Sequence, residues 1–125
     1  MMSASNRRIE HLRRMTRRPT PPGQVVAGLL EELGITQGEA AERLGVGRQT
    51  VNELLRSKRI LTPDMAHRLG RLFGNGPQLW LNMQQNLEMW DALHMDVSSY
   101  EGIKALQTDE DLSEEISGHN LVNVN

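Results

Sequence analysis

Three polar side chains close together in the chain have the chemistry needed to read the edges of DNA bases. They are Arg48, Gln49 and Asn52, within the stretch RQTVNELL. An arginine can donate two hydrogen bonds to O6 and N7 of guanine, and glutamine or asparagine can pair in a similar two-point manner with N6 and N7 of adenine. In isolation such a polar face is more often simply solvated. Whether these three side chains can read DNA therefore depends on the helices that position them.

Further polar and basic residues flank this trio and are suited to contact phosphate. Gln37 precedes it, and Arg56, Lys58 and Arg59 follow it. Contacts to phosphate oxygens position a protein on a duplex without reading its sequence. We expect these residues to contact the DNA backbone, with an ordinary basic surface as the alternative for the last three.

Two short helices joined by a tight turn must carry these side chains. The first begins after Thr36, which can cap it with Glu39 as the capping partner, and it ends at Gly45. The second spans 48–55, where the apolar residues form one stripe and the other positions are polar. Helices that cross at a steep angle need a small residue at their contact and a glycine at the turn, and Ala41 and Gly45 stand at those places.

Three further helices are predicted around this pair. The first follows Pro22 and closes at Gly34, because glycine takes the left-handed conformation of a helix end at little cost. The second begins with Thr62 as cap and a proline in the first turn, and it ends at Phe73. The third begins at Pro77. No stretch shows a comparable alternating pattern typical of a strand.

Charge is distributed unevenly along the chain, although the formal net charge is only −2. Residues 1–20 contain six arginines and one glutamate, residues 21–90 are neutral, and residues 91–125 contain one lysine and eight acids. We therefore predict a basic arm and linker at 1–20, a DNA-binding and dimerisation domain at 21–93, and an acidic, largely flexible tail at 94–125. The arm is a marginal amphipathic helix at best, and we expect it to track DNA phosphates.

The segment from Thr36 to Arg59, above all LGVGRQTV at 44–51, resembles the Cro/repressor (XRE) family of helix-turn-helix proteins. With KR at 58–59, TPDMA at 62–66 and WLNMQ at 80–84, it is similar more narrowly to the HigA/VapI-type antitoxins. The resemblance covers roughly residues 19–93. The family usually has serine or threonine where this chain has Gly47, so a phosphate contact from that hydroxyl is missing here.

The resemblance implies an all-α, lambda-repressor-like fold of five helices and a homodimer on a pseudo-palindromic operator. It also implies repression of the chain's own operon and neutralisation of a small ribonuclease toxin of the HigB type. The alternative is a stand-alone repressor without a toxin. Met83, Leu87 and Trp90 share one stripe of the last helix, and we expect them to form the dimer interface. Trp80 and Trp90 can each be core residues or partner anchors.

The acidic residues suggest where a toxin would bind. A ribonuclease presents a basic surface to RNA, so an inhibitor can cover that surface with acidic groups. The sequence offers two such places, the helical face around Glu31 and Glu42 and the acidic tail.

Several classes of function are disfavoured. The chain has no cysteine, which excludes disulfides and thiolate metal sites. The histidines lack the spacing of metal ligands and no catalytic motif is present, so we expect no enzyme activity, metal or cofactor. No apolar run is long enough to span a membrane, and the arginine-rich start lacks the apolar region of a secretory signal and the serines of an organellar transit peptide. We expect a cytoplasmic protein. The scattered histidines are His11, His67, His94 and His119.

Overall fold

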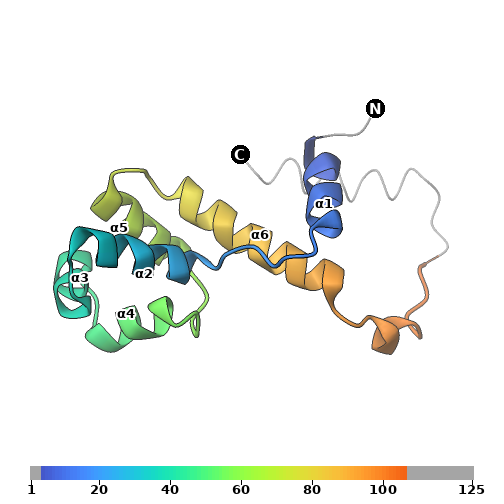
Figure 1. Cartoon of the computed structure of the whole chain (residues 1–125). Helices are drawn as coiled ribbons and strands as arrows, with labels where there is room; N and C mark the ends of the chain where they lie inside the picture. The colour runs from blue at the N-terminus through green and yellow to red at the C-terminus, as the bar shows by residue number, and fades with distance from the viewer. Residues whose placement is uncertain (1–3, 107–125) are drawn as a thin grey trace. The chain divides into compact units, whose positions relative to one another are not determined.

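The computed structural model describes residues 4–106, which fall into two compact units divided after Met95. The described part of the first unit is all-α and is shown in Figure 1; its six helices are α1 (Ala4–Arg14), α2 (Pro22–Leu33), α3 (Gln37–Leu44), α4 (Arg48–Leu55), α5 (Pro63–Phe73) and α6 (Gln78–His94). The described part of the second unit contains one 3₁₀ turn, η1 (Ser98–Tyr100). The all-α class is confirmed, whereas the expected count of five helices is wrong, because most of the basic arm is the additional helix α1.

The prediction of a flexible acidic tail falls largely on residues 107–125, which lie outside the described residues. Between residues 4 and 106, no helix is long and apolar enough to cross a membrane.

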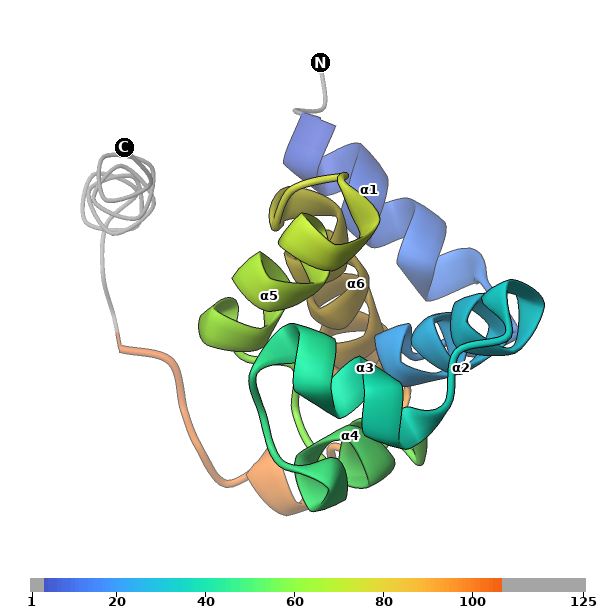
Figure 2. The same ribbon diagram turned by 90° about the vertical axis from the view of Figure 1, so that its left-hand side faces the viewer.

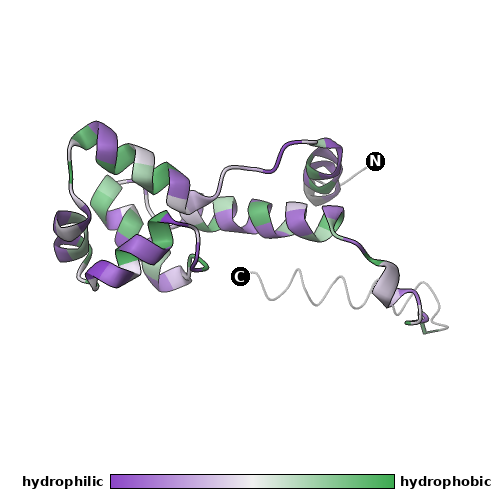
Figure 3. Ribbon diagram, turned by 60° about the horizontal axis from the view of Figure 1, so that its bottom comes forward, coloured by the Kyte–Doolittle hydropathy of each residue, from purple (hydrophilic) through white to green (hydrophobic). Residues whose placement is uncertain are grey.

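The hydrophobic core lies where α2 to α6 meet, and each of these helices contributes a fully buried side chain. Trp80 is the largest of them, and its indole Nε1 donates a hydrogen bond to Asn75 Oδ1 at 3.0 Å. A buried indole that satisfies its N–H in this way can fill a core without an unpaired donor. Figure 3 shows the alternating hydrophobic and hydrophilic bands along α6 that make one of its faces suitable for this packing. Trp80 is therefore a core residue, packed with Val26, Ala40, Val51 and Leu69.

The ends of the helices follow the capping signals in the sequence. Thr36 Oγ1 accepts a hydrogen bond from the Glu39 N–H at 3.1 Å, and Thr62 Oγ1 accepts one from the Met65 N–H at 3.2 Å. The Glu39 carboxylate, expected to be the capping partner, instead accepts a hydrogen bond from the Arg43 guanidinium at 3.1 Å, one turn further along the surface of α3. Helices α2, α3 and α5 end at glycines whose positive φ angles, +69°, +70° and +75°, suit a residue without a side chain. These are Gly34, Gly45 and Gly74.

The basic segment before the first proline is a helix because α6 holds it. Leu12 of α1 is only 4% exposed, and the Arg8 Nε donates to Asn86 Oδ1 of α6 at 2.8 Å. An isolated helix this short is marginal in water, so packing against α6 supplies the stability that its sequence lacks.

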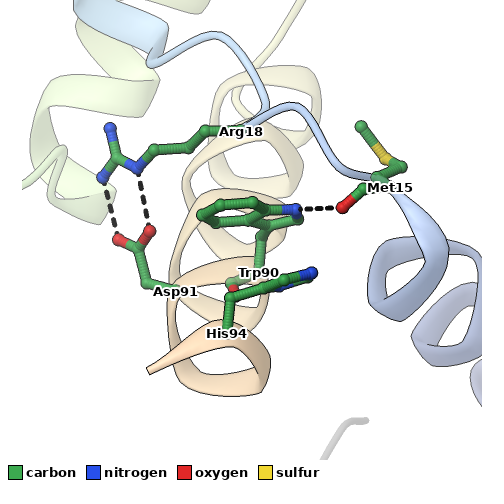
Figure 4. Close-up of polar contacts among 5 residues, drawn as sticks. All are labelled: Met15, Arg18, Trp90, Asp91 and His94. Atoms are coloured by element: carbon green, nitrogen blue, oxygen red, sulfur yellow. Dashed lines mark hydrogen bonds and ion pairs between the residues drawn. The ribbon is translucent and has the colours of Figure 1, made fainter. Parts of the chain in front are cut away.

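The linker after α1 is fastened to the last turns of α6, as Figure 4 shows. The Trp90 indole N–H donates to the Met15 carbonyl at 2.9 Å, and the Arg18 guanidinium donates two hydrogen bonds of 2.8 Å to the Asp91 carboxylate. These bonds from Arg18 hold the pKa of Asp91 below its usual range. His94 stacks on Trp90 with ring centroids 4.0 Å apart. The segment from Met15 to Arg18 is thus a strap across α6.

The position of α1 matters for the arm's expected role. In Figures 1 and 2, α1 lies above α6 and α4 lies below it. Helix α1 thus lies away from α4, whereas Arg18 of the linker lines one cavity together with Lys58 and Arg59. That the arm tracks DNA phosphates stays a prediction.

Candidate nucleic-acid interface

The turn between α3 and α4 fixes the angle between the two helices. Gly45 has a φ of +70°, and the Val46 N–H donates to the Ala41 carbonyl at 3.0 Å, which closes the end of α3. Behind the turn, Ala41 and Val51 are buried with almost no exposed surface. The small side chain of Ala41 lets the helices approach, so the sequence-based assignment of the crossing point and the turn agrees with the structure.

The turn is also locked from outside by an arginine of α5. Arg68 Nη1 donates to the Leu44 carbonyl at 2.7 Å, while its Nε donates to Asp64 at 2.8 Å. A cation at the carboxyl end of a helix satisfies an unpaired carbonyl and interacts favourably with the helix dipole. Sequence reasoning missed Arg68, because its partner lies 24 residues away and no local pattern marks it.

The predicted base-reading residues lie on the first two turns of α4. Arg48 and Gln49 are exposed and Asn52 is half-buried. The Arg48 guanidinium lies beside Gly38, where a Cβ would be in ordinary van der Waals contact with the Arg48 Nε at 3.4 Å. The guanidinium therefore lies across the first turn of α3, next to the surface that a duplex would meet.

Gln37 and Asn52 are brought together although 15 residues separate them. The Asn52 amide donates to Gln37 Oε1 at 3.2 Å. This contact restricts the rotation of the Asn52 amide, which lowers the entropy cost of presenting it to a base edge. The phosphate contact expected of Gln37 stays a prediction, and the structure adds a positioning contact to it.

Glu53 organises the basic residues that follow α4. Its carboxylate accepts hydrogen bonds from Arg59 Nη2 at 2.6 Å and from Gln49 Nε2 at 3.2 Å, and these bonds hold the pKa of Glu53 below its usual value. Arg56 and Lys58 are exposed and have no ion-pair partner within the described residues. They are thus available for phosphate contact, whereas Arg59 is already paired. Sequence reasoning missed Glu53, which looked like one polar position among several.

The amino end of α4 is open. Its cap residue is Gly47, which has no side chain to occupy the free N–H groups of the first turn. Such N–H groups together with the helix dipole favour a phosphate. Because the hydroxyl is missing at this position, only backbone donors are present there for a phosphate.

The expected dimer residues already make contacts within the chain. Leu87 is only 8% exposed, Met83 packs against the core, and Trp90 is half-buried beneath the Met15 strap. The dimer interface at these positions stays a prediction. Among the described residues, no cluster of histidine and acidic side chains could hold a metal ion.

This geometry, a short second helix held across a first one with polar groups at its open amino end, defines a DNA-binding helix-turn-helix protein. The family model described as "Helix-turn-helix" matches residues 27–80. Antitoxin HigA-1 of Vibrio cholerae is 38% identical over 81 residues, which are 64% of this chain and 76% of that protein. Virulence-associated protein I of Dichelobacter nodosus is 36% identical over 89 residues, 70% of this chain and 82% of that protein.

A solved structure extends the likeness to three dimensions. The Pseudomonas aeruginosa antitoxin HigA, solved with the higBA promoter, is 32% identical, with a TM-score of 0.63 over 73% of this chain and all of that one. The chain belongs to the helix-turn-helix family of HigA/VapI-type antitoxins. This is a family of DNA-binding regulators and not of enzymes.

Proposed function

We propose that the chain binds a pseudo-palindromic operator as a homodimer, represses its own operon in the bacterial cytoplasm and neutralises a ribonuclease toxin of the HigB type. The observation that carries the DNA-binding half is the open amino end of α4 with Arg48, Gln49 and Asn52 around it. The solved complex of the Pseudomonas HigA with its promoter supports this proposal. The toxin half rests on the family.

Base reading falls to the residues at the start of α4. In a helix-turn-helix the amino-terminal part of the second helix enters the major groove and brings its exposed side chains to base edges. Arg48 and Gln49 can reach bases directly, while Asn52 presents an amide that Gln37 orients. Each good two-point contact gives about 1–3 kcal/mol of discrimination between bases.

Phosphate contacts fall to the backbone N–H groups of the first turn of α4 and to the exposed cations after it. Arg56 and Lys58 have no ion-pair partner among residues 4–106, and Arg59 contributes when a phosphate competes with Glu53 for its guanidinium. These contacts fix the register of the protein on the duplex and make the affinity depend on salt. A dimer then sets two α4 helices about one helical turn of DNA apart, roughly 34 Å.

The experiment measures binding to the chain's own promoter fragment by fluorescence anisotropy at several salt concentrations. Gln49→Ala should lower the preference for operator over unrelated DNA, because it removes a base contact, and should leave the salt slope nearly unchanged. Lys58→Ala should weaken binding to all DNA alike and flatten the slope by about one. Gln85→Ala, an exposed amide on α6, serves as the control and should behave like the unaltered chain.

Gln37→Ala separates the two roles of that residue. If Gln37 orients Asn52, the variant should lose operator preference as Asn52→Ala does. If Gln37 instead contacts phosphate, the variant should lose affinity for every sequence equally. Unchanged operator preference in both the Gln49→Ala and Asn52→Ala variants would contradict the assignment of α4 as the reading helix.

The second candidate is a stand-alone repressor without a toxin. The α3–α4 site serves both functions equally, so the partner decides between them. Co-expression of the chain with the protein encoded by the neighbouring open reading frame tests this. If the neighbouring protein stops cell growth, and the chain restores growth and forms a stable complex with it, the antitoxin is supported. If the neighbouring protein is harmless and does not bind the chain, the plain repressor is supported.

A further inference from the structure

Apolar side chains occupy every third position of the described part of the second unit and are open to solvent. Val97, Tyr100, Ile103 and Leu106 are 56%, 49%, 76% and 82% exposed. Nothing within the described residues of this unit covers them. Adjacent exposed apolar groups of this kind usually mark a surface that binds another molecule.

The backbone of this segment holds a three-residue repeat. The Tyr100 N–H donates to the Val97 carbonyl at 3.0 Å, and the Ile103 N–H donates to the Tyr100 carbonyl at 2.9 Å. Bonds between residues three apart place every third side chain on the same face. These two bonds bring Val97, Tyr100 and Ile103 close together along a compact turn segment.

The start of the repeat is fixed by a local cap. The Asp96 carboxylate accepts hydrogen bonds from the Ser98 N–H at 2.9 Å and from the Ser98 hydroxyl at 3.1 Å. Both bonds lower the pKa of Asp96, so the cap is charged at neutral pH. The cap thus orders the start of the segment locally, and local order of this kind reduces the entropy lost on binding.

Charge restricts what this face can bind. Residues 96–125 contain seven acidic residues and one lysine. DNA is repelled by such a segment, and so is the same segment of a second copy. A protein that binds RNA presents a basic surface, and an acidic segment with apolar anchors matches it.

We propose that residues 97–106 are the docking segment for the toxin. The apolar face enters a hydrophobic groove of the toxin, and the surrounding acidic side chains meet its basic RNA-binding surface. Tyr100 and Ile103 are the central anchors, since buried aromatic and aliphatic groups usually dominate such contacts. This inference rests on the proposed antitoxin function and names the surface that performs it.

The test uses the full-length chain and, as probe, a catalytically inactive form of the protein encoded by the neighbouring open reading frame. Tyr100→Ser and Ile103→Ser remove one anchor each without changing the charge. Ser99→Ala is the matched control, because this exposed residue lies in the same turn between the anchors. Titration calorimetry gives the Kd, and anisotropy with the promoter fragment gives operator affinity.

Each anchor substitution should raise the Kd for the toxin at least about tenfold, because burying one such side chain contributes at least that much. Ser99→Ala should leave it unchanged. Operator affinity and the melting temperature should stay the same in all three variants, since these residues are not part of the core of the first unit.

Three outcomes would overturn the inference. Unchanged toxin affinity in both anchor variants refutes the proposal that residues 97–106 dock the toxin, and it leaves the antitoxin function unaffected. Loss of self-association in the Ile103→Ser variant with normal toxin affinity assigns the face to a second copy of the chain. Failure of the unaltered chain to bind the toxin overturns the antitoxin function, and the docking segment with it.

Discussion

A single methyl group at Gly23 should displace the carboxyl end of α4, because α2 and α4 touch there through their backbones. An ideal Cβ at Gly23 would lie 1.8 Å from the Leu54 carbonyl oxygen and 2.9 Å from its carbon. Carbon and oxygen atoms that are not bonded rarely approach closer than about 3.3 Å. In the Gly23→Ala variant the helices must therefore separate by roughly 1.5 Å, given that contact limit.

The same helix provides a matched control. A Cβ at Gly28 would meet nothing within 4 Å. Alanine is more favourable than glycine in a helix by about 0.5–1 kcal/mol, so Gly28→Ala should stabilise the protein by that amount. Gly23→Ala should gain much of the same helix stability, but overpacking against Leu54 should lower the stability by about 1–3 kcal/mol. The difference between the variants should thus be about 1–3 kcal/mol, which corresponds to roughly 5–20 °C in melting temperature for a unit of this size.

The assay is thermal unfolding followed by circular dichroism, together with operator binding well below both melting temperatures. We expect Gly23→Ala to melt lower than Gly28→Ala and to bind the operator more weakly, because α4 is displaced. Equal melting temperatures, or a more stable Gly23→Ala variant, would refute the reasoning that backbone contact between α2 and α4 sets the position of the reading helix.

Three further predictions concern other contacts. Arg68→Ala should lower the free energy of unfolding by about 1–2 kcal/mol in a urea titration, because the Leu44 carbonyl loses a charged donor, and an unchanged midpoint would contradict that role. The unaltered chain should sediment at twice its 14.1 kDa mass and Met83→Glu as a folded monomer, whereas a dimeric variant would move the interface elsewhere. Asp91→Asn should speed tryptic cleavage after Arg17 by loosening the strap. Because the pKa of Asp91 is lowered in the folded chain, the strap's contribution to stability should be present above about pH 4 and be lost as pH falls through the lowered value. The difference in cleavage rate between the unaltered chain and Asp91→Asn, followed with an acid-stable protease, should therefore shrink as the pH falls, and a difference that stays constant would count against the role of this carboxylate.

The helix-turn-helix could be predicted because its signals are local. Thr36, Gly45 and Thr62 act on backbone groups within a few residues, and each marks the same boundary in the sequence and in the structure. The exposure of Arg48 and Gln49 follows from that local frame, since they lie on the first turn of a helix whose start is known. The same locality explains the correct assignment of α2, α5 and α6.

Contacts between residues far apart in the sequence could not be predicted, and such contacts join the two ends of the first unit, α1 with its linker and α6. The arm was expected to be a marginal helix at best, but α6 holds it as the helix α1, through Asn86 and Asp91, which lie more than seventy residues away from their arginine partners. No local pattern in 1–20 indicates such partners. Two other contacts between distant residues could not be predicted for the same reason: the hydrogen bond from Asn52 to Gln37 and the one from Arg68 to the Leu44 carbonyl.

The sequence by itself therefore determined the positions of α2 to α6 and the turn between α3 and α4, because caps, glycines and apolar spacing act over one or two turns. Only the tertiary structure decided what holds those helices and where the extra segments lie. A marginal helix such as α1 forms when a neighbour covers its apolar side, and the energy of that contact depends on two surfaces at once. A single stretch of sequence contains only one of them.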